Sequence, residues 1–577
     1  MHDRRNHLES AVKLGKVLVT SAWPYINVIP HLGNLVGSIL SADVAARYYR
    51  LRGDEVLLVS GSDEHGTPIE VEALRQGITP KALTDRNHAR VAELFQRWGA
   101  SFDNYTRTES PVHKEFVQET LMKIYRNGYI FSQETQMLYC EHDQRFLPDR
   151  FVEGKCPYCG YERARGDQCD MCGRLLETTF LIEPRCVICG NAPTVKTTRH
   201  WYIDLSKFAE PLTTYIKNNQ QLPANAKNFS LNWIKEGLKP RAVTRDVEWG
   251  IPAPFPGAEG KTIYVWVEAV LGYVSATIEH CRRIGEPEKW REFWFDKSAK
   301  TLYFVGKDNI PFHTIILPAL LLATGEGYNL PWNVSATEFL KFKGEKASKS
   351  QRIGIWIDEA LELFPADYWR FFLMVTRPET KDTNFSWEFF LEKINADLND
   401  TFGNFIHRTL SFINARFNSE IPQPQKLMRD DEAVMQTVKE KVEEAAREFE
   451  DAKLQSAANT LISIGRIGNQ YLNEKEPWNL IKTDREKAAG ILYVAAQIIK
   501  AIALVSAPFM PSTAEQLWQT LNLPGRVHKS RWEEAVEPLA AGHKIAKATP
   551  LFRKIDADAK KLDEMLAKIR EKPAKLI

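Results

Sequence analysis

Apolar residues recur with two different periods in the first sixty residues of the chain. Lys16–Thr20 is a short β-branched run bounded by Gly15, and Leu57–Ser60 is a second apolar run, so each predicts a buried strand. Between them, His31–Arg50 has the apolar spacing of a helix and stops at Gly53. This strand–loop–helix–strand order predicts the start of a parallel nucleotide-binding sheet, and hence an α/β Rossmann-type domain.

The carboxyl-terminal third of the chain has only the helical period. Apolar residues recur at three- and four-residue spacing in 395–417, 432–451, 454–473 and 486–506, which predicts an all-α bundle. The tail over 541–577 holds ten Lys/Arg against five Asp/Glu, with a helical pattern in Ile555–Ile569. We expect this tail to form a solvated helix that folds back on the bundle.

Two distant segments carry candidate phosphate chemistry, and the first is His31-Leu32-Gly33-Asn34. Unpaired backbone N–H groups and the positive end of the helix dipole would favour phosphate here, and Gly33 would allow a close approach. The imidazole of His31 and the amide of Asn34 could donate hydrogen bonds to phosphate oxygens. An ordinary helix start is the alternative interpretation of this tetrapeptide.

The second segment, Lys341–Ser350, contains four lysines and one glycine. Its ammonium groups could clamp a pyrophosphate leaving group, although taken alone the segment is more typical of a solvated basic loop. Together and in this order, the two segments predict the phosphate-handling parts of one ATP site. The chain is therefore interpreted as an enzyme that activates an acid with ATP.

Seven of the eight cysteines lie between Cys140 and Cys189, which in an intracellular protein indicates metal binding rather than disulfides. The pairs Cys156-x2-Cys159 and Cys169-x2-Cys172 have the spacing of one tetrahedral structural zinc site, with surface thiols or redox pairs as the alternative. A second zinc site is possible, formed by Cys186, Cys189 and Cys140. Its fourth ligand is either Asp143, which has the usual two-residue gap and is weakly favoured, or His142, which is the better zinc ligand chemically.

Length and charge narrow the classes of protein that remain. A chain of 577 residues predicts two to four domains. Its net charge of +2 gives no overall electrostatic attraction to nucleic acid, so an RNA partner would need local basic patches. The longest apolar run is expected to be too short for a membrane span, and the polar residues 1–15 lack the core of a signal peptide. A cytoplasmic protein without a membrane partner is expected.

The histidine-led segment and the lysine loop resemble the His-Ile-Gly-His and Lys-Met-Ser-Lys-Ser elements of class I aminoacyl-tRNA synthetases. Flanking segments narrow the resemblance to the methionyl-tRNA synthetase family, most like its archaeal type, and it runs from about Lys16 to about Trp532. These segments are Ser21-Ala22-Trp23-Pro24-Tyr25, Ser62-Asp63-Glu64-His65-Gly66-Thr67-Pro68, Tyr264-Val265-Trp266-Val267-Glu268-Ala269, Gly272-Tyr273 and Gly306-Lys307-Asp308-Asn309-Ile310-Pro311-Phe312-His313.

Three positions depart from the family pattern. Asn34 replaces a second histidine but keeps a hydrogen-bond donor, and Ala347 replaces a methionine, which is mostly a packing change. Trp23 stands where a leucine is expected, and its larger ring could reshape the methionine pocket.

The resemblance implies ATP-dependent activation of L-methionine to methionyl-adenylate and transfer to the 3′ end of tRNA(Met), initiator tRNA included, with release of pyrophosphate and AMP. It implies a split Rossmann-type catalytic domain with a zinc-knuckle insertion, followed by an all-α bundle. The expected parts are a polar extension over 1–15, the catalytic domain over 16–130 and 245–345, the insertion over 131–244, a lysine loop and stem-contact region over 346–394, an anticodon-binding domain over 395–540 and a basic helical tail over 541–577.

Site residues are implied by the same resemblance. Asp63 would bind the substrate ammonium group, Arg245 would lie near its carboxylate, and the pocket would be lined by Ala22, Trp23, Tyr25, Trp266, Tyr273 and His313. ATP, with Mg²⁺, would contact His31, Gly33, Asn34, Gly306, Asp308, Lys346, Ser348 and Lys349, and catalysis would rest on His31, Asn34, Lys346 and Lys349. For methionine, an unbranched apolar substrate, an aromatic lining with one anion is the expected chemistry.

The bundle is expected to read the tRNA anticodon. Asn404 and Arg408 are four residues apart and share a helix face, and Trp478, after Pro477, could stack an unpaired base. On sequence alone, a core tryptophan and a surface Asn/Arg pair form a strong alternative interpretation of these residues. A monomer without an appended tRNA-binding barrel is expected.

Three alternatives explain less of the sequence. A class I nucleotidyltransferase has no need of zinc knuckles and a helical RNA-binding third, and a zinc-ribbon RNA binder has no need of Asp63, Trp266 and Asp308. Synthetases for isoleucine, valine or leucine carry a much larger editing insertion than residues 131–244.

Overall fold

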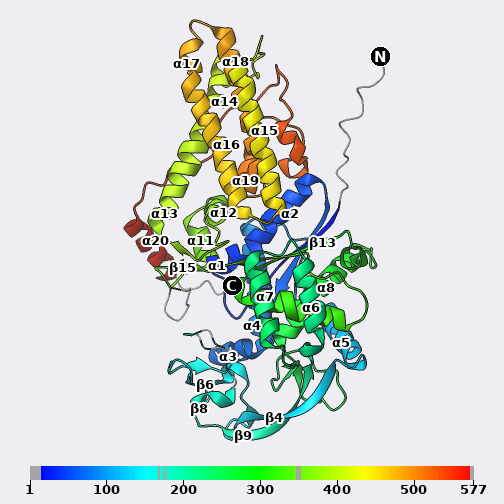
Figure 1. The fold of residues 1–577 in the computed structure, drawn as a ribbon. Helices are drawn as coiled ribbons and strands as arrows, with labels where there is room; N and C mark the ends of the chain where they lie inside the picture. Colours follow the sequence, from blue (N-terminus) through cyan, green and yellow to red (C-terminus); the bar gives the residue numbers. More distant parts are fainter. Residues whose placement is uncertain are drawn as a thin grey trace, which may run out of the picture.

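A parallel sheet lies at the centre of the protein (Figure 1). The computed structural model describes residues 15–571 except 167, 168, 170, 173, 175, 177 and 346–352. Within this part of the chain the sheet has the order β14(Asn333–Thr337), β13(Lys300–Gly306), β1(Lys16–Ser21), β2(Glu55–Ser62), β3(Asn104–Arg107), with every neighbouring pair parallel. The expected α/β Rossmann-type fold is confirmed, and the winding reverses between β1 and β13, where such sheets bind ligands.

The helix expected over 31–50 is present but interrupted. It consists of α1(Leu32–Asn34), the π-helix η1(Leu35–Ile39) and α2(Leu40–Arg52), and it ends where Gly53 adopts φ 95°. The other helices around the sheet are α3(Thr67–Gln76), α4(Pro80–Arg97), α5(Pro111–Arg126), α8(Val265–Arg283), α9(Trp290–Trp294), the 3-10 turn η5(Lys307–Asn309), the π-helix η6(Phe312–Ile316) and α10(Leu317–Ala323). A π-turn thus follows His31 and another contains His313.

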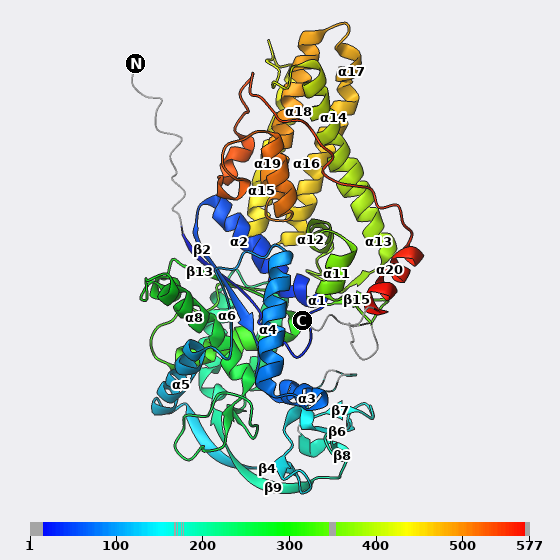
Figure 2. The same cartoon turned by 180° about the vertical axis from the view of Figure 1, so that it is seen from behind.

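An insertion separates β3 from β13. Its long arm pairs β4(Ile130–Cys140) with β9(Thr194–Ile203) antiparallel, and a small sheet of β6(Val152–Lys155), β7(Ala164–Arg165) and β8(Ile182–Cys186) carries most of the cysteines. The remaining elements of this part are β5(Arg145–Phe146), η2(Asp149–Phe151), η3(Thr178–Phe180), η4(Leu205–Phe208), α6(Ala209–Asn218), α7(Ala224–Glu236), β10(Arg241–Ala242), β11(Thr244–Arg245) and β12(Thr262–Ile263). Figures 1 and 2 place the β4–β9 arm and the small sheet at the end of the molecule opposite the helical bundle.

The link between sheet and bundle runs through β15(Leu340–Phe342), α11(Ile357–Leu363), α12(Ala366–Val375), β16(Thr383–Phe385) and α13(Trp387–Glu392). The expected all-α bundle follows, with its predicted helices present. It contains η7(Lys393–Gly403), α14(Asn404–Arg416), α15(Arg429–Glu450), α16(Leu454–Lys475), α17(Pro477–Leu480), α18(Arg485–Ser506), α19(Pro511–Thr520), η8(Val527–Lys529) and η9(Trp532–Val536).

One expectation about the carboxyl-terminal third is wrong, because the tail helix does not fold back on the bundle. Helix α18 is long and apolar enough to cross a membrane by length and composition, but 94 % of its apolar window is buried, so it is the core helix of the bundle. The tail helix α20(Ala559–Glu571) does not lie on the bundle itself but packs on α11 and α13, where Arg570 pairs with Glu359 at 2.7 Å and the Trp387 indole donates to Asp563 at 2.9 Å. Figure 2 shows α20 beside α13 and β15.

Candidate active site

His31 caps the helix that follows β1. Its Nδ1 accepts hydrogen bonds from the backbone N–H groups of Gly33 at 3.0 Å and Asn34 at 3.4 Å, and the Asn34 side-chain oxygen accepts from the His31 backbone N–H. The N–H of Leu32 donates to the Ile355 carbonyl. The expectation of unpaired N–H groups at this helix start is therefore wrong, because the histidine cap and a neighbouring segment satisfy them.

This cap fixes the chemistry of the His31 imidazole. Because Nδ1 accepts hydrogen bonds, the proton of the neutral ring lies on Nε2, and burial lowers the pKa of His31 to about 4. A Cβ at Gly33 would lie 2.8 Å from the His31 ring, so this glycine makes room for the imidazole. The sequence suggested another reason for glycine at this position, the close approach of a phosphate ligand.

Asp63 follows β2 at the carboxyl edge of the sheet. Its backbone pairs with the loop after β1, through Ile26 N to Asp63 O at 3.2 Å and Asp63 N to Pro24 O at 3.0 Å. The side chain is buried, and its Oδ1 has no hydrogen-bond partner among the described residues. Burial raises the pKa of Asp63 well above its usual range, and the charge of Glu268 raises it further. A buried carboxylate oxygen without a hydrogen-bond donor is unfavourable, so this oxygen is available to a donor from a ligand.

Tyr273 and His313 form one buried hydrogen-bonded pair. The Tyr273 hydroxyl donates to His313 Nε2 at 2.7 Å, while His313 Nδ1 donates to the Asn309 carbonyl at 2.8 Å. Burial lowers the pKa of His313 to about 4, so the ring stays neutral and its tautomer is fixed. Trp266 packs against Phe312, with ring centroids 4.1 Å apart and the ring planes tilted by 44°.

Trp23 is accommodated by two glycines rather than by a reshaped pocket. A Cβ at Gly61 on β2 or at Gly272 on α8 would lie 2.7 Å from the indole ring. The ring lies at 6.4 Å, edge to face, from Tyr273. The preceding residue, Ala22, is held by a backbone hydrogen bond to the Phe304 carbonyl on β13.

A cavity of about 190 Å³ opens beside these residues. Of the expected site residues, Tyr25, Trp266 and Arg245 line this cavity, together with Arg150 and Tyr264. Its lining does not include the other expected pocket residues, Ala22, Trp23, Asp63, Tyr273 and His313. The Arg245 guanidinium lies 3.6 Å from the centre of the Tyr264 ring and donates to the Thr244 carbonyl. Sequence reasoning missed Arg150, because it belongs to the cysteine-bearing insertion and reaches the pocket only through the fold.

The expected ribose-binding segment follows β13. Asp308 is exposed, and Gly306 lies next to its carboxylate, since a Cβ there would be 3.3 Å from Asp308 Oδ1. The neighbouring Lys307 is tied to Glu338 at 2.5 Å and Asp382 at 3.1 Å. Lys346, Ser348 and Lys349 lie outside the described residues.

Comparison with known proteins decides the family. Residues 17–410 match the family model "tRNA synthetases class I (M)", and residues 421–570 match "Anticodon binding domain of methionyl tRNA ligase". The chain is 53 % identical to methionine–tRNA ligase of Pyrobaculum aerophilum over 558 residues, which is 97 % of each chain, and 53 % identical to that of Korarchaeum cryptofilum over 96 % of this chain and 98 % of that relative. The chain belongs to the methionyl-tRNA synthetase family.

Solved structures agree with this family in fold. Mycobacterium tuberculosis methionyl-tRNA synthetase bound by methionyl-adenylate superimposes with a TM-score of 0.77 at 24 % identity, covering 94 % of this chain and 100 % of that one.

The cysteines of this synthetase gather into two groups of four metal-ligand side chains. One is Cys156, Cys159, Cys169 and Cys172, and the other is Cys140, Asp143, Cys186 and Cys189, with the ligand atoms of each group within 4.8 Å of one another. Sulfur–sulfur distances within these groups are 3.5 to 3.9 Å. They fit tetrahedral zinc, because Zn–S bonds of about 2.3 Å place two sulfur ligands about 3.8 Å apart. Thiolate donors in these numbers suit zinc better than harder cations.

The anticodon-reading residues expected in this family also meet in space. The Arg408 guanidinium on α14 lies 4.6 Å from the centre of the Trp478 ring on α17 and donates to Asn473 at 3.0 Å. Asn404 and Arg408 are exposed on the same helix, whereas Pro477 is buried and Trp478 half-buried. Trp478 is therefore not a core residue.

Proposed function

We propose that this synthetase activates L-methionine with ATP and transfers it to the 3′ end of tRNA(Met), the initiator tRNA included, in the cytoplasm and as a monomer. The observation that carries the choice of substrate is Asp63, a buried carboxylate without a partner for Oδ1, beside an aromatic pocket at the switch point of the sheet. An apolar amino acid supplies the missing ammonium group and fills such a pocket.

In this proposal Asp63 binds the ammonium group of methionine and Arg245 its carboxylate. The side chain lies among Ala22, Trp23, Tyr25, Trp266, Tyr273 and His313. Since His313 Nε2 accepts a hydrogen bond from the Tyr273 hydroxyl, this hydroxyl has a fixed direction. Its oxygen is then available to orient the thioether of methionine.

The ATP phosphates contact the first turn of the His31 helix. His31 Nε2–H and the Asn34 amide donate to phosphate oxygens, because Nδ1 and the Asn34 oxygen are used within the cap. Gly306 and Asp308 bind the ribose, and Lys346, Ser348 and Lys349 contact the leaving pyrophosphate. Mg²⁺ bound with ATP would neutralise phosphate charge. The methionine carboxylate then attacks the α-phosphorus in line, and positioned donors stabilise the charge that develops.

Other parts of the chain serve the tRNA. Zinc at one or both cysteine groups would hold the insertion rigid, since four protein ligands leave no open position. Asn404, Arg408, Pro477 and Trp478 would read the anticodon, with the Arg408–Trp478 pair as a platform for an unpaired base. The domain limits given from the sequence are part of this proposal.

The test is amino-acid-dependent exchange of pyrophosphate into ATP, measured across the amino acids with the parent chain and Asp63→Asn. Methionine alone should support rapid exchange, and Asp63→Asn should raise its KM roughly 10- to 100-fold, because one charged hydrogen bond is worth about 1.5–3 kcal/mol. Asp430→Asn, an exposed aspartate on the bundle, is the matched control. Exchange driven by another amino acid, or an unchanged KM in Asp63→Asn, would refute the assignment.

A further inference from the structure

A buried histidine, His65, lies between two carboxylates and comes two residues after Asp63 in the chain. The Nδ1 of His65 is 2.9 and 3.0 Å from the two oxygens of Glu268 on α8, and its Nε2 is 2.8 Å from Glu109. His65 and Glu268 are 1 % and 0 % exposed. Because each ring nitrogen has a carboxylate partner, both donate, and the ring is an imidazolium. Burial alone would lower the pKa of His65, but Glu268 and Glu109 raise it to about 10.

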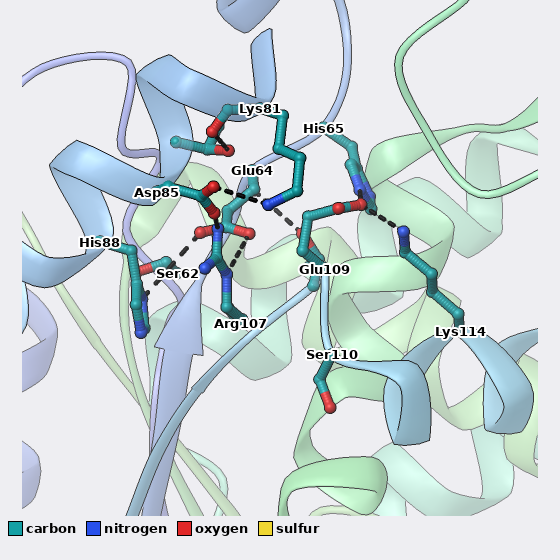
Figure 3. A network of polar contacts seen from close by, with 12 residues as sticks. Ser62, Glu64, His65, Lys81, Asp85, His88, Arg107, Glu109, Ser110 and Lys114 are labelled. Carbon is teal, nitrogen blue, oxygen red and sulfur yellow. Dashed lines mark hydrogen bonds and ion pairs between the residues drawn. The ribbon is translucent and has the colours of Figure 1, made fainter.

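The other charged groups around His65 come from three elements. Lys114 on α5 pairs with Glu109 at 2.5 Å, and His113 on the same helix has its Nε2 3.9 Å from Glu268 but is neutral, because burial lowers its pKa to about 3. Next to Asp63 in the sequence, Glu64 Oε2 accepts from Arg107 at 2.8 Å, and Arg107 also binds Asp85 (Figure 3). The other oxygen, Glu64 Oε1, has no hydrogen-bond partner among the described residues. The Tyr25 hydroxyl donates to the His65 carbonyl.

Charges in this cluster do not cancel without substrate. Asp63, Glu268 and Glu109 carry three negative charges when ionised, whereas His65 and Lys114 carry two positive ones. The ammonium group of an amino acid at Asp63 would bring the cluster to neutrality. Glu268 disfavours ionisation of Asp63, while the charge of His65 favours it, so the balance at Asp63 depends on the histidine.

We propose that His65 is a positioning residue whose fixed positive charge, together with that of Lys114, neutralises Glu268 and Glu109 and so favours the ionised form of Asp63 that receives the substrate ammonium group. This inference rests on the proposed role of Asp63. It also gives Glu268 a function, because its two hydrogen bonds to Nδ1 hold the imidazolium next to Asp63. His65 itself does not contact the reacting atoms.

The experiment compares His65→Gln with His65→Gln/Glu268→Gln in methionine-dependent pyrophosphate exchange between pH 6 and 9. The single variant leaves Glu268 without a counter-charge, so Asp63 takes up a proton more readily. We expect the KM for methionine to rise about tenfold or more at pH 7, as for a pKa change of one unit, and to recover toward pH 9, with the KM for ATP unchanged. The double variant removes the excess charge, and its pH profile should return toward that of the parent.

Two further readouts separate charge from structure. The hydroxy analogue of methionine, 2-hydroxy-4-(methylthio)butanoate, lacks the ammonium group, so its inhibition constant should not rise in His65→Gln. His88→Gln is the matched control, since His88 hydrogen-bonds Ser62 at 2.8 Å without contacting Glu268. Its profile should match the parent.

Several outcomes would overturn the inference. The first is a His65→Gln variant whose KM for methionine has the same pH profile as the parent. The second is an inhibition constant of the hydroxy analogue that rises as much as the KM for methionine. The third is a double variant whose KM is raised as much as that of the single variant at every pH. If the parent chain itself shows no methionine-dependent exchange, the proposed function fails instead.

Discussion

Trp23 shows how one residue that departs from a family pattern constrains others far along the chain. Its indole occupies the space that a side chain at Gly61 or Gly272 would need, with only 2.7 Å to a Cβ at either position. The sequence showed the large ring but not the two glycines that admit it, because 38 and 249 residues separate them from Trp23. The tryptophan and the glycines therefore form one packing unit beside the proposed methionine site.

Gly272→Ala should destabilise the protein by about 1–3 kcal/mol, as overpacking of a well-filled core does. In a Trp23→Leu background Gly272→Ala should destabilise the protein less, because the indole ring that the new methyl group would meet is absent. Gly490→Ala in α18, whose Cβ would meet no atom closer than 4.0 Å, is the matched helical control. Urea unfolding of the four combinations measures the coupling, and strictly additive effects would contradict it.

At the scale of elements, the end of β4 decides the fourth ligand of the second cysteine group. Asp143 Oδ2 lies 3.0 Å from Cys186 Sγ and 3.3 Å from Cys140 Sγ, whereas His142 is exposed and its Nδ1 lies 3.0 Å from the other oxygen of Asp143. Of the two ligands left open by the sequence, the structure places Asp143 in the group. His142 is positioned to orient the Asp143 carboxylate from outside, as outer partners of metal ligands do.

If both groups bind zinc, elemental analysis of the purified protein should find two zinc ions per chain. Asp143→Ala should lower this number to about one, because three ligands hold zinc less tightly than four, while His142→Ala should keep it near two. Cys156→Ser should also lose one ion, independently of Asp143. Loss of zinc in His142→Ala together with full retention in Asp143→Ala would reverse the assignment.

At the scale of the whole molecule, a buried arginine joins the catalytic sheet to the bundle. Arg370 on α12 donates to Asp43 on α2 at 2.7 Å and to the carbonyls of Trp98, Pro508 and Phe509. Burial raises the pKa of Asp43, but Arg47 and Arg370 outweigh it and hold that pKa far below its usual range. Because the helix that His31 caps continues through α1 and η1 into α2, Arg370 fixes that helix to the segment that follows α18.

Buried neutral histidines should make the whole molecule sensitive to acid. Burial lowers the pKa of His31, His88, His313 and His528 to about 4 and that of His113 to about 3. The unfolded chain, with histidine pKa values near 6.5, then binds more protons between pH 6.5 and 4, so stability must fall as the pH falls through this window.

A series of thermal melts should therefore show a melting temperature that declines steadily below pH 6.5. His65 acts in the opposite sense, since its stabilising charge is lost only as the pH rises toward 10. A melting temperature that is constant between pH 7 and 4.5 would contradict the buried, neutral state of these rings.

The sequence by itself determined the fold class, the bundle, the cysteine groups and the family, since hydrophobic period, cysteine spacing and long motifs are local features of the chain. The residue roles drawn from the family remain predictions. Local pattern failed where the environment of a residue matters: the N–H groups at His31 are capped, and α20 packs on α11 and α13 rather than on the bundle. Only the tertiary structure brought Arg150 to the pocket, fitted Trp23 between two glycines and placed His65 between Glu268 and Glu109. Burial and charge pairing depend on groups that are distant in sequence, and these contacts exist only once the chain has folded.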